Sequence, residues 1–90
     1  MYFYVDLSLT SFVGRCRYGF DETDSIEQIK TSDALKCQQK CELRRECVAF
    51  SYTPGDTDNN CVLYKGGPYT HGDKDAKSIC YIMAKGSTAY

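Results

Sequence analysis

The fold of this chain is decided by one stretch, Cys37-Gln38-Gln39-Lys40-Cys41-Glu42-Leu43-Arg44-Arg45-Glu46-Cys47-Val48-Ala49-Phe50-Ser51-Tyr52, and by Cys61-Val62-Leu63-Tyr64 soon after it. Strong helix formers without Gly or Pro follow Ser32, which is a favoured N-cap residue. The pattern predicts a helix that begins near Ser32, extends toward Arg45, and carries Ala34, Cys37 and Cys41 on one inward stripe. Leu43 lies off that stripe, so the last turn is expected to bend away or end early.

Outside this helix, runs of β-branched and aromatic residues alternate with polar segments. Strands are predicted at residues 12–18, 47–52, 61–64 and 78–84. Polar loops are predicted at residues 21–25, 54–60 and 71–75, and only a short turn at Ile26 and Ile29. One strand, a helix and three further strands indicate an α+β domain, in which one α-helix packs on an antiparallel sheet.

Six cysteines in 90 residues indicate a disulfide framework made in an oxidising compartment. A chain this short buries too little surface to be stable through its core alone. Cys37 and Cys41 lie on one helix face with parallel side chains, so they are poorly placed to bond each other. Pairing each with its nearest partner predicts a nested set, Cys16–Cys80, Cys37–Cys61 and Cys41–Cys47.

Patterns for metal binding or catalysis are weak. A zinc site needs a second pair of ligands at short spacing, and only one pair of cysteines qualifies. Asp56-x-Asp58-x-Asn60 resembles the start of a calcium loop but lacks its later Gly and Glu. His71 is the only histidine and lies in a polar loop, and bridged cysteines leave no nucleophile. We therefore predict no cofactor, no metal and no enzymatic activity.

The charged residues point to a different kind of site. The 11 basic and 12 acidic side chains nearly cancel, which gives no bulk attraction to nucleic acid. Lys36, Lys40 and Arg44 recur every four residues and, with Arg45, form a basic helix edge able to meet sulfate or carboxylate groups on a glycan or a protein. The alternative is a solvated helix face. Tyr69 is predicted at the surface, as a further ligand-binding candidate.

The chain is predicted to form one domain. No apolar run approaches the roughly 18 residues of a membrane span, so direct membrane insertion is not expected. The first residues do not resemble a secretory signal, and we expect a module of a larger secreted precursor. Residues 12–84 are assigned to the domain and 85–90 to a C-terminal tail. Residues 1–11 are an N-terminal extension or inter-module linker, with an edge strand as the alternative.

The cysteine spacing and the two strand sequences together resemble the PAN/apple domain family. In that family a helix carries two cysteines, a third cysteine opens a strand with an aromatic-x-aromatic end, here Phe50 and Tyr52, and a fourth precedes a Leu. Cys16 and Cys80 match the extra outer pair of the apple subgroup. The resemblance covers residues 12–84. It implies the same nested pairing and a five-stranded antiparallel sheet that cradles one helix.

The resemblance also implies a function. Such modules act in extracellular adhesion, often as tandem copies, and bind proteins or carbohydrates. Overall, the chain is most similar to modules of apicomplexan microneme adhesins, which implies storage in a parasite secretory organelle and a role in host-cell attachment. The alternatives are an apple-type interaction module of a secreted protease zymogen and a free-standing disulfide scaffold such as a protease inhibitor. The family shares no fixed ligand residue, so none is carried over.

Overall fold

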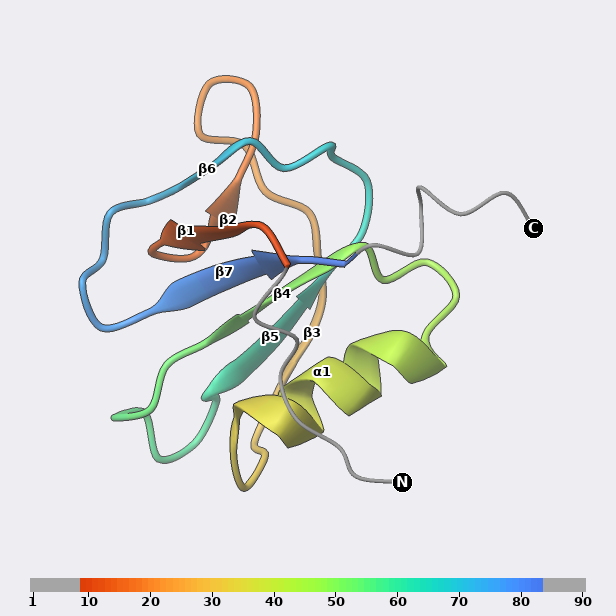
Figure 1. The fold of residues 1–90 in the computed structure, drawn as a ribbon, viewed down its shortest axis with the longest axis vertical. Helices are drawn as coiled ribbons and strands as arrows, with labels where there is room; N and C mark the ends of the chain where they lie inside the picture. The colour runs from red at the N-terminus through yellow and green to blue at the C-terminus, as the bar shows by residue number, and fades with distance from the viewer. Residues whose placement is uncertain (1–8, 84–90) are drawn as a thin grey trace.

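The computed structural model describes residues 9–83, which form one helix packed on a five-stranded antiparallel sheet (Figure 1). The elements are β1 (Ser11–Val13), β2 (Cys16–Arg17), β3 (Ser25–Ile29), α1 (Ala34–Leu43), β4 (Ala49–Tyr52), β5 (Cys61–Tyr64), β6 (His71–Gly72) and β7 (Ile79–Ile82). The strand order is β1-β7-β4-β5-β3, and β2 and β6 form a separate two-stranded sheet. The predicted fold class is confirmed. Residues 1–8 and 84–90, with most of the predicted extension and tail, lie outside the described residues.

The helix α1 begins one residue later than predicted. Its N-cap is Asp33, whose Oδ1 accepts the backbone N–H of Lys36 at 2.9 Å, so the prediction of Ser32 as the cap is wrong. A carboxylate at this position also interacts favourably with the positive end of the helix dipole. Cys37 and Cys41 are fully buried, in agreement with the predicted inward stripe. The helix ends at Leu43, in agreement with the expectation that its last turn ends early.

The single strand predicted at residues 12–18 is two strands in the structure. The chain turns at Gly14, where φ is 105°, a conformation that side chains other than Gly rarely adopt. A Cβ at Gly14 would also overlap Oδ1 of Asp73 and the backbone nitrogen of Lys74. The break moves Cys16 out of the main sheet into β2, which pairs with β6 in a region predicted as a loop.

The turn predicted at Ile26 and Ile29 is instead the edge strand β3, which pairs with β5. Two apolar residues three apart do not share one face of a regular strand, because side chains alternate with a period of two. The register of β3 shifts between Ser25 and Glu27, and this bulge places Ile26 and Ile29 against the same core. The same shift leaves Ser25 and Gln28 opposite Tyr64 and Val62 of β5.

The sheet buries both of its faces, so β5 is buried at all four positions. The helix-side core consists of Cys37, Cys41, Cys47, Phe50, Cys61, Leu63 and Met83. The far-side core consists of Cys16, Ala49, Val62, Tyr64, Tyr69 and Cys80. None of the described helices is long and apolar enough to cross a bilayer.

Three disulfides hold these layers together. They are Cys16–Cys80, Cys37–Cys61 and Cys41–Cys47, the same pairs as in the predicted nested set, with Cα–Cα distances of 5.0, 5.5 and 5.3 Å. Two bridges lie in the helix-side core and tie α1 to β5 and to the segment that follows the helix. The outer bridge lies in the far-side core and ties β2 to β7.

Candidate functional site

The predicted basic helix edge is exposed but partly neutralised. Lys36, Lys40 and Arg45 are exposed. Arg44 forms an ion pair with Glu27 of β3, and its Nε lies 3.7 Å from a carboxylate oxygen of Glu46. The charge of Arg44 is therefore partly neutralised within the domain, and the exposed Lys36, Lys40 and Arg45 remain available to a ligand.

Tyr69 is not a surface residue, and the prediction that it lies at the surface is wrong. Only 5% of it is exposed. Its hydroxyl donates to the backbone oxygen of Lys65 at 2.6 Å and accepts the backbone N–H of Asp24 at 3.1 Å. Its ring lies 5.1 Å from that of Tyr18, edge to face, and 5.3 Å from that of Tyr64. Burial raises the pKa of this hydroxyl above its usual value. Tyr69 is thus part of the far-side core.

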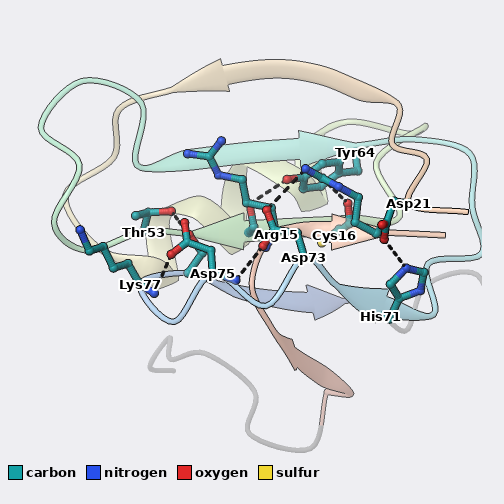
Figure 2. A network of polar contacts seen from close by, with 12 residues as sticks. Arg15, Cys16, Asp21, Thr53, Tyr64, His71, Asp73, Asp75 and Lys77 are labelled. Carbon is teal, nitrogen blue, oxygen red and sulfur yellow. Dashed lines mark hydrogen bonds and ion pairs between the residues drawn. The ribbon is translucent and has the colours of Figure 1, made fainter.

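A network of polar contacts centred on Asp73 lies beside β2 (Figure 2). Oδ1 of Asp73 accepts the backbone N–H of Arg15 at 2.8 Å and that of Asp75 at 3.0 Å. Oδ2 lies 3.5 Å from a guanidinium nitrogen of Arg17. Partial burial, the largest single influence, acts to raise the pKa of Asp73, but these N–H groups and the charges of Arg17 and Arg15 together lower it.

This lowered pKa predicts how Asp73 affects acid stability. A carboxyl group whose pKa is lower in the folded state stabilises the fold above its unfolded pKa of about 3.9, and that contribution is lost as the pH falls through the folded pKa. We expect Asp73→Asn to destabilise the domain at neutral pH and to match wild type in strong acid. Urea unfolding monitored by circular dichroism between pH 2 and 7 measures the free energy of unfolding of both proteins. A difference between wild type and variant that stays constant over this pH range would contradict the prediction.

Next to this network lies a cavity of about 100 Å³ on the far side of the sheet from α1. It is lined by Arg15, Arg17, Thr23, Ser25, Gln28, Val62 and Tyr64. Sequence reasoning missed this site. The sequence signal for this site was the pair Arg15 and Arg17 on either side of buried Cys16, because residues two apart share one side of a strand. The polar residues opposite them lie on or beside β3, which was predicted as a loop and a turn.

In the hairpin loop with the calcium-like pattern, side-chain oxygens of Asp56 and Asn60 accept hydrogen bonds from backbone groups of the domain. Oδ1 of Asp56 accepts the backbone N–H groups of Asp58 and Asn59, both at 2.9 Å, and these bonds lower the pKa of Asp56. Asn60 is buried and bonded to Thr31. Within residues 9–83, no group of three or more His, Cys, Asp or Glu side chains is placed to hold a metal ion.

The side chain of His71, the only histidine, contacts two neighbouring polar side chains. Nε2 of His71 lies 3.0 Å from a carboxylate oxygen of Asp21, and Nδ1 lies 3.0 Å from the hydroxyl of Thr70 (Figure 2). All the cysteines of the chain are bridged. Between residues 9 and 83 there is no free thiol, and the imidazole contacts the side chains of Asp21 and Thr70.

These observations define a class of protein: a small domain held together by three disulfides, in which one helix packs on a five-stranded antiparallel sheet. The family model of the PAN domain matches residues 15–86, and the chain therefore belongs to the PAN domain family. PAN domains are non-catalytic modules that mediate interactions with proteins or carbohydrates. Neither a curated protein nor a solved structure gave a significant match to the chain.

Proposed function

We propose that this PAN domain is an adhesion module, one of several tandem copies in a secreted adhesin that attaches a parasite to its host cell. The observation that carries the proposal is the small size of two exposed polar sites, the basic helix edge and the cavity beside β2. The helix edge offers three exposed cations, and the cavity beside β2 has a volume of about 100 Å³. Sites of this size bind weakly on their own, and repetition raises the avidity by about 10²–10⁴ without any new contact.

The path of the chain through the sheet is compatible with a tandem arrangement. The backbone N–H of Ile82 donates to the oxygen of Thr10 at 2.9 Å, so the chain enters and leaves the sheet at adjacent points. Under this proposal, the connections to neighbouring copies lie within residues 1–8 and 85–90, because Thr10 and Ser11 already pair with β7.

The test compares one domain with four domains joined by flexible linkers, on cells and on a glycan array. We expect the four-domain protein to bind at least about 100-fold more tightly, because the second and later contacts become intramolecular. A matched control of the same size joins one native domain to three unrelated domains, and it should bind as weakly as the single domain. Equal affinity of the single and four-domain proteins would contradict the proposal, as would no binding by either.

The helix edge is tested in the same assay. Within the proposal, Lys36, Lys40, Arg44 and Arg45 remain candidate ligand residues, whereas buried Tyr69 is no longer one. The four-domain protein carrying Lys36→Gln and Lys40→Gln in every copy measures what this edge contributes. Both side chains are exposed on α1, so the substitutions leave the cores intact.

A further inference from the structure

We propose that the cavity between β2 and β3 binds one anionic sugar unit, through a carboxylate or sulfate group held by Arg15 and Arg17. This inference rests on the proposed function and names the ligand chemistry of one site. The cavity lies on the face of the sheet opposite α1, because its lining residues Val62 and Tyr64 belong to the far-side core. It is therefore a different site from the basic helix edge.

Arg15 supplies the first observation. Its Nε is buried, and within residues 9–83 it has no hydrogen-bond partner. A buried N–H of a charged group that bonds to nothing is costly, and such groups in folded proteins are rare. The backbone N–H of Arg15 is anchored by Asp73 at 2.8 Å, which holds the residue in place without occupying its guanidinium group. Arg15 also lines the cavity, so a ligand there would lie beside a guanidinium group whose Nε has no acceptor within the described residues.

Arg17 adds a second cation. One of its guanidinium nitrogens donates to the backbone oxygen of Cys16 at 2.9 Å, and another lies 3.5 Å from Oδ2 of Asp73, the upper limit for a hydrogen bond. No carboxylate lines the cavity. Arg15, Arg17 and Tyr64 all line this one cavity. Two guanidinium groups beside one small cavity favour a carboxylate or sulfate ligand.

The remaining lining residues favour a sugar over an acidic peptide. Thr23, Ser25 and Gln28 are exposed, neutral and able both to donate and to accept hydrogen bonds, as sugar hydroxyls require. Val62 is the only aliphatic residue of the lining, so the cavity offers no pocket for an apolar peptide side chain. A volume of about 100 Å³ holds a single charged substituent, and the sugar ring would lie over the exposed rim.

The experiment titrates the single domain with monosaccharides and follows its ¹⁵N NMR spectrum, which includes the Nε–H signals of the arginines. The probes are methyl glucuronide, galactose 6-sulfate and neutral methyl galactoside, with acetate, sulfate and a hexaglutamate peptide alongside. We expect the Arg15 Nε–H signal and the amides of Thr23, Ser25 and Gln28 to shift with one or both charged sugars. The neutral sugar should leave them unchanged.

Variants separate this site from the helix edge. Arg15→Gln keeps the anchored backbone N–H, and it should weaken binding of the charged sugar about tenfold or more, the change expected when a hydrogen bond to a charged group is lost. Ser25→Glu places a carboxylate on the exposed rim and should abolish binding without disturbing either core. Lys36→Gln, the matched loss of one charge on α1, should leave binding unchanged.

Different results would contradict the sugar, the site or the proposed function. Shifts that are as large with acetate or sulfate alone, or larger with hexaglutamate, would overturn the assignment to a sugar. Full binding by Arg15→Gln, or no shift with any charged sugar, would overturn the site itself. In both cases, tighter binding by the four-domain protein than by the single domain would leave the proposed function standing. The relative affinities for the glucuronide and the sulfated sugar identify which anionic group is preferred.

Discussion

Replacing Cys16 and Cys80 together by Ala is expected to lower the free energy of unfolding by about 4 kcal/mol. The two residues are 64 positions apart, and without the bridge the unfolded chain regains the conformational freedom of that long loop. Both sulfur atoms are fully buried in the far-side core, so the substitution also leaves unfilled space there. Because small domains have a total stability of only about 5–15 kcal/mol, this loss is a large share of the total.

Urea unfolding of the oxidised proteins, followed by circular dichroism, measures this effect. The matched control is the double replacement of Cys41 and Cys47, which are 6 positions apart and also fully buried. The same loop-entropy relation gives this short bridge only about 2.4 kcal/mol. Equal losses in the two variants would contradict the argument from loop length.

Asn60→Ala is expected to destabilise the domain by about 2–4 kcal/mol, a large effect for one residue in a hairpin loop. The Asn60 side chain accepts the backbone N–H of Thr31 at 2.8 Å and donates to the backbone oxygen of Thr31 at 2.7 Å. Both residues are buried, so removing the amide leaves two backbone groups without partners or water. The contact fixes the segment that leads from β3 into α1.

Asn59→Ala is the matched control, because Asn59 is exposed and engages Asp56 only through its backbone. It should change the stability by less than about 0.5 kcal/mol. Asn60→Asp keeps the acceptor for the Thr31 N–H but sets a carboxylate oxygen against the Thr31 carbonyl, and it should also be destabilised. Chemical denaturation of the three variants tests this, and an Asn60→Ala protein as stable as wild type would refute it.

The helix, the hairpin and the bridge Cys41–Cys47 were predictable because short spacings determine them, and Cys16 and Cys80 remained as the last pair once Cys37 was assigned to Cys61. The positions of Cys37 and Cys41 on one turn of a helix leave few partners within reach, and Cys47 and Cys61 begin or precede the nearest strands. The runs at Cys61–Tyr64 and at residues 47–52 are β-branched or aromatic, with polar turn formers between them. Such signals act within a few residues, and a sequence shows them directly.

The strand β3 could not be predicted from the same signals. Ile26 and Ile29 are three apart, which is the spacing of a turn or a helix rather than that of a strand. They share a face only because pairing with β5 introduces a bulge. Pairing between distant strands is a property of the folded chain, and the cavity that depends on Ser25 and Gln28 of β3 went unseen with it.

The burial of Tyr69 was also not predictable from its local sequence. It follows a Gly-Gly-Pro segment that is typical of an exposed loop, yet it is 5% exposed. Its hydroxyl is satisfied by backbone groups of Asp24 and Lys65, and its ring by Tyr18 and Tyr64. Because a tyrosine is stable either in water or in a core that satisfies its hydroxyl, its own local sequence does not decide between them.

The sequence by itself determined the class of fold and the PAN family, because both depend on residue type and short spacing, and it determined the cysteine pairs because assigning the inner two left Cys16 and Cys80 for each other. Only the tertiary structure decided which surface is available for binding. It buried Tyr69, paired Arg44 with Glu27, and brought Arg15 and Arg17 of one strand region against Ser25 and Gln28 of another. A binding surface is made by residues far apart in the chain, and their proximity exists only after the sheet has formed.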